Sequence, residues 1–236
     1  MALLQMEKLN AFYGAAQVLW DVAMEIGHDE IVALIGANGA GKTTLMRTIT
    51  GLVKKNNGSI FYQEENILGL DPAQIVSRGI ALVPEGRCLF TGMTVTENLL
   101  MGAYLRRNKS EIRSSLEKIF DFFPKLRERK DQITGKMSGG EQQMCALGRA
   151  LMSAPKVLLI DELSLGLAPV FVDELLEILK RVRLENISIL LVEQDVQTGL
   201  DISDRAYVFE HGRIVMQGFS RELQNNLKIR ESYLGI

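Results

Sequence analysis

The chain has 236 residues, of which 47% are hydrophobic, so it can bury a full core as one large domain or as a core with an inserted lobe. Its 27 basic and 29 acidic residues leave a net charge of -2, which excludes a whole-chain field that attracts nucleic acid or anionic lipid. No run approaches the roughly 18 apolar residues that span a bilayer, and residues 1–14 do not resemble a secretory signal. We therefore expect no nucleic-acid partner and a chain that stays in the cytosol.

Five segments are predicted as strands from their apolar patterns. From Gln17 to Ile26 apolar residues fall on even positions, with Leu19 as the exception, as in a half-buried antiparallel strand. Residues 31–35, 80–83, 157–160 and 187–192 are apolar throughout, and strands of that kind belong to a sheet covered on both faces. Helical patterns separate them. The chain thus predicts an α/β fold with a mostly parallel sheet and ligands at the carboxyl ends of its strands.

The strand over residues 31–35 leads into GANGAGKTT, which fits the pattern G-x-x-x-x-G-K-[ST] and continues as a helix closed by Gly51. Its glycines let consecutive amides turn toward phosphate oxygens, and the amino end of the helix adds partial positive charge. Lys42 can reach the β- and γ-phosphates, and Thr43 can ligate Mg²⁺. The residues expected to cradle the phosphates are Gly36, Ala37, Asn38, Gly39, Ala40, Gly41, Lys42, Thr43 and Thr44.

Between residues 85 and 136 no comparable strand appears, and helix signals replace it. Thr94 and Glu97 have capping-box spacing, and residues 112–123 carry an apolar helix face that stops at a proline. Further along, residues 205–218 predict a hairpin that turns at His211 and Gly212. We expect one domain, with boundaries at about residues 1–84 and 156–236 for the core and about 85–155 for an inserted helical lobe.

A second strand, residues 157–160, runs directly into Asp161 and Glu162. In a phosphate-loop site an acidic group at the end of a neighbouring strand holds Mg²⁺ through its water shell, and Asp161 is suitably placed. Glu162 can then point at the water that attacks the γ-phosphate. The simpler interpretation, a strand that merely ends at a polar loop, explains one acid but explains the pair poorly.

Residues 137–143 read MSGGEQQ and open an amphipathic helix. With the phosphate loop before it and VLLIDE after it, this order resembles the ATP-binding subunits of ABC transporters, from about residue 4 to residue 236. The resemblance implies the ABC ATPase fold: a phosphate-loop core with a mostly parallel sheet, an antiparallel β subdomain and an inserted helical lobe. It also implies ATP and Mg²⁺ as ligands and a head-to-tail dimer. In that dimer the signature residues of one subunit close on the γ-phosphate held by the other: Ser138, Gly139, Gly140 and Glu141.

Three further positions take their roles from this resemblance. Tyr13 matches the aromatic residue that stacks on adenine. Glu85 stands where most of the family has a glutamine that senses the γ-phosphate and Mg²⁺, and its carboxylate can still bind the ion. Gln194 stands where most members have a histidine, and an amide can donate a hydrogen bond but cannot carry a proton. We therefore expect hydrolysis to rest on Glu162, with Lys42 and Gln194 assisting.

The stretches LVPEG, LLVEQ and SLGLAP and the ending YLGI together resemble one branch, the shorter LivF-type ATPase of branched-chain amino-acid importers. This implies a peripheral protein on the cytoplasmic face of the inner cell membrane. The implied partners are a second ATPase or a second copy of this chain, two integral-membrane permeases and an amino-acid-binding protein. Leu163 departs from the branch, which has proline there, so we expect a less rigid loop after Glu162.

Three alternatives stay open from the residues alone. Glu85, Leu163 and Gln194 also suit a regulatory nucleotide-binding subunit that does not hydrolyse ATP. Another cargo is possible, because the cargo site would lie on other chains. A nucleotide-dependent clamp is disfavoured, because the interval from Lys42 to Ser138 holds no heptad run.

Overall fold

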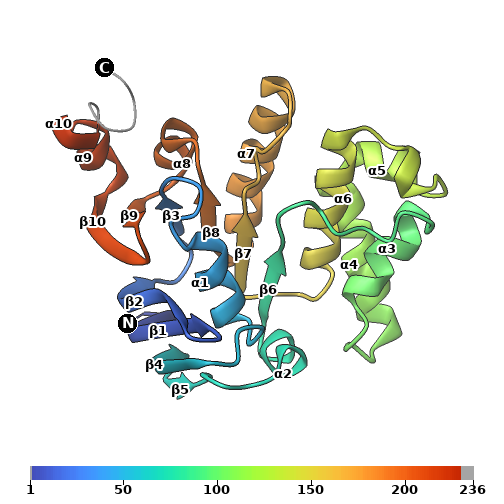
Figure 1. Cartoon of the computed structure of the whole chain (residues 1–236). Coiled ribbons are helices and arrows are strands. Elements are labelled where there is room, and N and C mark those ends of the chain that lie inside the picture. Colours follow the sequence, from blue (N-terminus) through green and yellow to red (C-terminus); the bar gives the residue numbers. More distant parts are fainter. Residues whose placement is uncertain (1, 230–236) are drawn as a thin grey trace.

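The computed structural model describes residues 2–229 (Figure 1). The closing YLGI stretch, residues 233–236, on which part of the branch resemblance rests, lies outside the described residues. A six-stranded sheet runs through the molecule in the order β10-β9-β3-β8-β7-β6, and all its neighbouring strands are parallel except β9 and β10. Its strands are β3 (Ile31–Ile35), β6 (Ile80–Val83), β7 (Val157–Asp161), β8 (Ser188–Glu193), β9 (Arg205–Glu210) and β10 (Arg213–Phe219).

The four continuously apolar segments are strands of one sheet, as predicted, and they form its centre and one edge. Every residue of β3, β7 and β8 is buried. Successive residues of β7 alternate between two core clusters: Leu158 and Ile160 pack with the helices of one face, whereas Val157 and Leu159 pack with those of the other. The sheet is therefore covered on both faces. The predicted hairpin is also confirmed, with positive φ angles at His211 and Gly212.

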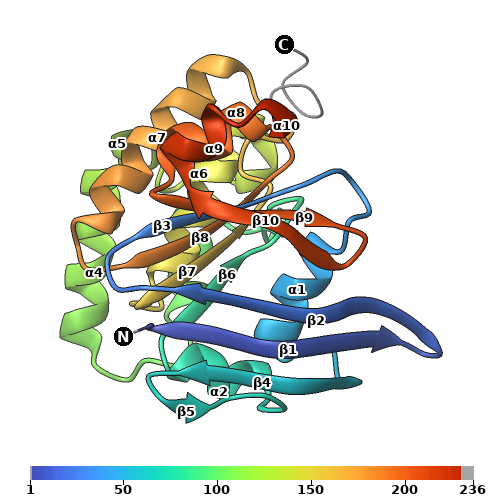
Figure 2. The ribbon, with the colours of Figure 1, turned by 90° about the vertical axis from the view of Figure 1, so that its left-hand side faces the viewer.

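A second, four-stranded antiparallel sheet has the order β2-β1-β4-β5 and lies beside the first (Figure 2). Its strands are β1 (Leu4–Tyr13), β2 (Ala16–Ile26), β4 (Asn56–Tyr62) and β5 (Glu65–Asn66), of which the sequence patterns predicted only β2. The prediction that the even-numbered side chains of β2 face the core was wrong at the start of the strand. There Leu19 is fully buried and Trp20 is 39% exposed. The reason is a β-bulge. Leu19 pairs with Ala11 and Val22 pairs with Leu9, so β2 has one extra residue between these pairs, and the side chains before the bulge point to the opposite face from those expected.

Two helices begin, and a third ends, where the local signals predict. Thr94 and Ser138 cap their helices, each in a capping box with the glutamate three residues on. The apolar face over residues 112–123 belongs to a helix that ends at Phe122. No helix within residues 2–229 is long and apolar enough to cross a membrane. The helices are α1 (Lys42–Ile49), α2 (Pro72–Ser77), α3 (Val95–Gly102), α4 (Lys109–Phe122), α5 (Pro124–Glu128), α6 (Gly139–Leu151), α7 (Pro169–Arg183), α8 (Val196–Ile202), α9 (Ser220–Gln224) and α10 (Leu227–Ile229).

Only helices and turns lie between β6 and β7 in the described chain, apart from one isolated bridge. They pack together as one group beside the large sheet (Figure 1). Asn98, which is fully buried, ties this group together: its amide donates to the carbonyl of Phe90 at 3.0 Å and to Thr134 Oγ1 at 3.2 Å. The boundaries of the lobe and the core remain predictions.

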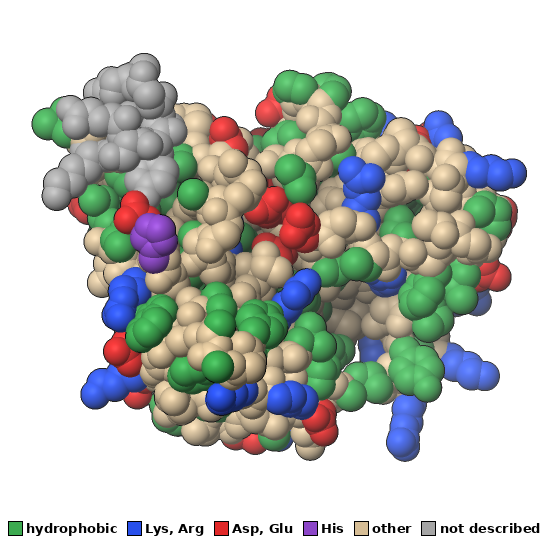
Figure 3. Space-filling model, viewed as in Figure 1, with side chains coloured by type: hydrophobic (Ala, Val, Ile, Leu, Met, Phe, Trp, Pro, Cys, Tyr) green, Lys and Arg blue, Asp and Glu red, His purple; other side chains and the backbone are tan. Residues whose placement is uncertain are grey.

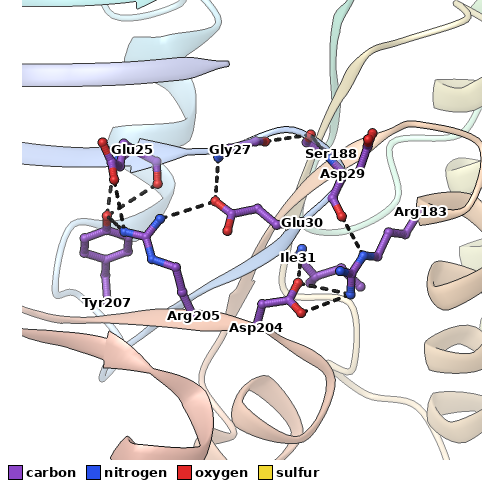
Figure 4. Close-up of polar contacts among 10 residues, drawn as sticks. All are labelled: Glu25, Gly27, Asp29, Glu30, Ile31, Arg183, Ser188, Asp204, Arg205 and Tyr207. Atoms are coloured by element: carbon purple, nitrogen blue, oxygen red, sulfur yellow. Dashed lines mark hydrogen bonds and ion pairs between the residues drawn. The ribbon is translucent and has the colours of Figure 1, made fainter. Parts of the chain in front are cut away.

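A polar network closes the amino-terminal edge of the large sheet (Figure 4). Ser188, at the start of β8, donates its hydroxyl to the carbonyl of Gly27 at 2.8 Å and accepts the N–H of Asp29 at 2.9 Å. Arg205 at the start of β9 lies 3.4 Å from the carboxylate of Glu30. These groups satisfy one another within the chain, so this edge offers few free polar groups to a ligand. The opposite, carboxyl-terminal edge holds a cavity and a buried carboxylate oxygen without a hydrogen-bond partner.

Candidate phosphate-binding site

A cavity of about 370 Å³ lies at the carboxyl-terminal edge of the large sheet. Acidic side chains gather near the centre of this face of the molecule, between the positions of α1 and α6 (Figure 3). Most residues lining the cavity were predicted from the sequence as site residues. Its lining is formed by Val18, Asn38, Gly39, Gly41, Lys42, Thr43, Thr44, Glu85, Glu162 and Leu165.

The phosphate-loop sequence forms a tight turn that opens one end of α1 to this cavity. Gly39 and Gly41 have φ angles of +78° and +108°, which glycine adopts at little cost. No side chain caps α1, and the N–H groups of a helix's first turn have no partner within the helix. These donors, together with the helix dipole, suit an anion.

The loop is held from behind by the hairpin of β9 and β10. A Cβ added to Gly36 would lie 2.2 Å from the carbonyl oxygen of Phe209, so only glycine permits this approach. At the tip of the hairpin the N–H of Gly212 donates to the carbonyl of Ala40 at 2.7 Å. Sequence reasoning predicted the hairpin but not that it supports the loop, because the two segments lie far apart in the chain.

Lys42 is the cation of the cavity. Its side chain is 4% exposed and donates to the carbonyls of Gly36 at 2.7 Å and Ala37 at 3.1 Å. Its Nζ lies 3.8 Å from Oε1 of Glu162, whose side chain is 10% exposed. A buried ammonium held by carbonyls and one carboxylate can exchange these weak partners for phosphate oxygens.

Asp161, the last residue of β7, supplies a carboxylate oxygen with no partner. The residue is 2% exposed, and its Oδ1 makes no hydrogen bond. Burial raises the pKa of this carboxyl, a hydrogen bond with Thr43 opposes the rise, and the neighbouring Glu162 and Glu85 add to it. An orphaned buried oxygen beside a hydroxyl and other carboxylates fits a hard cation such as Mg²⁺.

The described side chains do not form a complete cation site. Within residues 2–229 no group of three His, Cys, Asp or Glu side chains is placed to hold a metal ion by itself. Mg²⁺ commonly uses one or two protein ligands and takes the rest from phosphate oxygens and water. Thr43 and Asp161 therefore fit an ion that arrives with a nucleotide, and Glu85 lines the same cavity.

Glu162 follows β7 in a left-handed conformation with a φ angle of +54°, and its N–H donates to the carbonyl of Val192 at 3.0 Å. The next residue, Leu163, is fully buried in the core. We expected this leucine to loosen the loop because it replaces a proline. The described contacts hold the loop on both sides of Leu163, because the N–H of Glu162 donates to Val192 and Ser164 is hydrogen-bonded to Glu193. The effect of the missing proline on the rigidity of the loop stays a prediction.

Several expected site residues do not line the described cavity. Asp161 lies at the end of β7 and Gly36, Ala37 and Ala40 lie in the phosphate loop, whereas Gln194 and Tyr13 are exposed. Gln194 is exposed in the bend after β8. Tyr13 is 47% exposed at the end of β1, and Val18 on β2 lines the cavity near that turn. Glu193 ends a continuously apolar strand, a pattern that suggests a site, but sequence reasoning assigned it no role of its own. Its side chain is buried beside the loop that carries Glu162.

The signature residues lie on another part of the molecule, at the amino end of α6. Ser138 caps the helix, and Glu141 is committed within the chain because it accepts from Ser138 and lies 3.0 Å from Nε of Arg129. A Cβ added to Gly140 would lie 2.5 Å from the ring of Phe171, so α7 packs closely under this turn. Ser138, Gly139, Gly140 and Glu141 are all absent from the lining of the described cavity.

Comparison with known proteins decides the family. Residues 19–164 match the sequence model of the family described as ABC transporter. The chain is 48% identical to the high-affinity branched-chain amino acid transport ATP-binding protein BraG of Pseudomonas aeruginosa, over 99% of this chain and 100% of that one. The chain belongs to the ABC transporter family. It is an ATPase subunit of that family, as the sequence resemblance implied.

Two further matches cover this ABC transporter subunit almost completely. It is 37% identical to the probable branched-chain amino acid transport ATP-binding protein LivF of Archaeoglobus fulgidus, over 99% of each chain. Its fold matches a crystal structure of the ADP conformation of an ATP-binding cassette with a TM-score of 0.88 and 27% identity, over 100% of both chains. The predicted ABC ATPase fold is confirmed.

Proposed function

We propose that this chain binds and hydrolyses ATP with Mg²⁺ to energise an importer of branched-chain amino acids. The observation that carries the chemistry is that Lys42, Thr43 and Glu162 line one cavity at the carboxyl-terminal edge of the sheet, with the buried carboxyl of Asp161 hydrogen-bonded to Thr43. The branch is supported by the relatives BraG and LivF, which are named as branched-chain amino acid transport ATP-binding proteins.

The roles of the cavity residues follow from their chemistry. Lys42 and the amides of residues 36–44 bind the β- and γ-phosphates, while Thr43, Asp161 and Glu85 hold Mg²⁺. When bound, Mg²⁺ neutralises phosphate charge and orients the γ-phosphate. Glu162 orients the attacking water and accepts its proton.

The remaining nucleotide contacts come from outside the described cavity. Gln194 donates a hydrogen bond to the γ-phosphate after its exposed side chain turns inward, and the exposed ring of Tyr13 stacks on adenine.

The working unit we propose is a head-to-tail dimer. One chain has one phosphate loop and one signature turn, and they lie on different parts of the molecule. A second subunit therefore has to bring its signature turn to this cavity, where Ser138, Gly139, Gly140 and Glu141 would face the γ-phosphate. In that arrangement Glu141 would act by holding Ser138, because both of its carboxylate oxygens are already engaged by Ser138 and Arg129. The second subunit is another ATPase or another copy of this chain.

The helical lobe, about residues 85–155, is the part we propose to transmit closure to two integral-membrane permeases. A groove of about 360 Å³ beside β6 and α3 supports this, because it is lined by apolar side chains such as Phe90, 44% exposed, and Met101, 37% exposed. The chain would sit on the cytoplasmic face of the cell membrane, with an amino-acid-binding protein completing the importer.

Two measurements test this function. Steady-state MgATP turnover of the chain, alone and with its partners, separates a hydrolysing subunit from a regulatory subunit that only binds nucleotide. Identification of the copurifying permeases and of the ligand of their binding protein tests the cargo. Turnover that is absent from the assembled complex would overturn the hydrolytic role, and a binding protein selective for another ligand would overturn the cargo.

A further inference from the structure

The loop between β7 and α7 forms part of the cavity wall. Glu162 and Leu165, two residues of this loop, both line it. Between them, Leu163 is buried and Ser164 faces the end of β8. Ser164 therefore lies in the chain between the two side chains of this loop that line the cavity.

Glu193 is the group that holds Ser164. Its Oε1 accepts the backbone N–H of Ser164 at 3.1 Å, and its Oε2 accepts the hydroxyl at 2.7 Å. Both carboxylate oxygens are therefore used by one residue of the loop. A bidentate contact of this kind fixes the backbone and the side chain of Ser164 together.

Burying the Glu193 carboxylate beside other acids lowers the stability of the fold. Glu193 is 1% exposed, and the charged groups that act on it, Glu162 from the loop and Asp195 from the start of α8, are both acidic. Burial raises the pKa of Glu193 to about 7, the hydrogen bonds from Ser164 oppose the rise, and the two acids add to it. An apolar side chain would avoid this cost, so the contact serves position more than stability.

The same loop leads to the signature turn. After Ser164 the chain enters α7, whose Phe171 packs against Gly140 at the amino end of α6. A shift of the loop at Ser164 would thus move the side chains that line the cavity. Through α7, it would also displace the contact beneath the signature turn. Rigid packing of this kind transmits displacement because a close-packed contact cannot absorb it.

We propose that Glu193 is a positioning residue for ATP hydrolysis, which holds Ser164 so that the loop presents Glu162 to the cavity. The inference rests on the proposed function, since it assumes that Glu162 orients the attacking water. The described hydrogen bonds of the Glu193 side chain go to Ser164 and not to the phosphate loop or to a residue that lines the cavity, so its contact with this loop is made through Ser164.

The test compares Glu193→Ala with Glu193→Gln in the assembled transporter. A glutamine can accept the N–H of Ser164 through its oxygen and donate to the hydroxyl through its nitrogen, so both contacts survive without the charge. We expect Glu193→Ala to lower kcat by about tenfold or more while KM for MgATP changes by less than about threefold. The Glu193→Gln variant should keep kcat within about threefold of the native chain.

Two further variants separate position from stability. Ser188→Ala removes two hydrogen bonds from the opposite end of the same strand, where Ser188 is also 1% exposed, and should leave kcat within about threefold. Ser164→Ala removes the hydroxyl contact, and its combination with Glu193→Ala should be no worse than Glu193→Ala alone. Additive losses, an equal loss in Ser188→Ala, or native kcat in Glu193→Ala would each overturn the proposal.

Amide hydrogen exchange at Ser164 measures the hydrogen bond between its N–H and Glu193 independently of catalysis. Exchange should be faster in Glu193→Ala and unchanged in Glu193→Gln. Unchanged exchange in Glu193→Ala would overturn the proposal even if kcat fell. Full turnover in a Glu162→Gln variant would instead overturn the assigned role of Glu162, while faster exchange at Ser164 would still support the contact itself.

Discussion

Nζ of Lys42 lies 3.8 Å from Oε1 of Glu162, at the point where the phosphate loop and the end of β7 meet. The lysine opens α1 and the glutamate follows a strand more than a hundred residues later. Both side chains are largely buried, at 4% and 10% exposure. The fold thus places the cation that would bind the γ-phosphate beside the carboxylate that would orient the attacking water.

Replacing Lys42 by alanine should abolish productive ATP binding. The change removes the mobile cation from the cavity and leaves the negative charge of the phosphates, and of Glu162, under-compensated. Equilibrium binding of labelled ATP measures the effect. Lys54→Ala is the matched control, because that lysine is 63% exposed and its described ion pair is with an exposed aspartate, Asp71. Native affinity and turnover in Lys42→Ala would show that the phosphate loop has been misassigned.

Replacing Ser138 by arginine should leave ATP binding by the single chain intact and prevent ATP-dependent closure of the dimer. A long side chain at the amino end of α6 would occupy the approach to the partner's γ-phosphate. Light scattering with and without ATP detects closure. Thr94→Arg is the control, because it removes the same kind of capping box from α3. A normal ATP-dependent dimer in Ser138→Arg would rule out the head-to-tail geometry.

Replacing Glu162 by glutamine should preserve ATP binding and dimer closure but lower turnover by about a hundredfold or more, the range expected for an acid–base group. Gln194→His should change turnover by less than about tenfold, roughly 1.4 kcal/mol in the barrier, because an amide at this position carries no proton. Single-turnover rates of the assembled complex separate chemistry from assembly. Normal hydrolysis in Glu162→Gln together with an inactive Gln194→Ala would mean that the two roles are reversed.

Replacing Glu193 by glutamine should make stability less sensitive to pH. Its pKa of about 7 in the fold lies above the ordinary value of 4.5, so its stabilising contribution is present below about pH 4.5 and is lost as the pH rises to about 7. The variant's free energy of unfolding should therefore exceed that of the native chain by an amount that grows by on the order of 2–3 kcal/mol over this range.

Urea unfolding at several pH values between about 5 and 8 measures this difference. Glu177→Gln serves as the control, because Glu177 is an exposed carboxylate, 69% accessible, whose removal should leave the pH dependence unchanged. If the difference between Glu193→Gln and the native chain were the same at every pH, Glu193 would not titrate abnormally in the fold.

Replacing Gly212 by alanine should destabilise the chain and weaken ATP binding together. Its φ angle is +77°, and an added Cβ would lie 1.9 Å from the carbonyl oxygen of Val18, so the hairpin tip must leave Ala40 of the phosphate loop. Gly14→Ala is the control, because its φ of +61° is similar but nothing lies within 4 Å of the added atom. That control should cost about 1 kcal/mol, and Gly212→Ala should cost more. Urea unfolding and ATP titration of both variants provide the comparison.

Short-range patterns determined much of this protein. The phosphate loop with its strand and helix, the capping boxes at Thr94 and Ser138, and the buried strands of the large sheet all follow from residues within one turn or one strand of each other. Steric limits on glycine, side-chain caps and strand burial act over a few residues, so they can be read from the sequence. The family resemblance rested on the order of these same segments.

Tertiary structure decided what depends on distant segments. Leu19 turns inward because a bulge pairs it with Ala11, and Gln194 lies on the surface although it follows the same strand end as Glu193. Ser164 meets Glu193 only because β7 and β8 are neighbours in the sheet. No local pattern encodes such contacts: the direction of a side chain at the end of a strand is set by the packing of chains that fold against it.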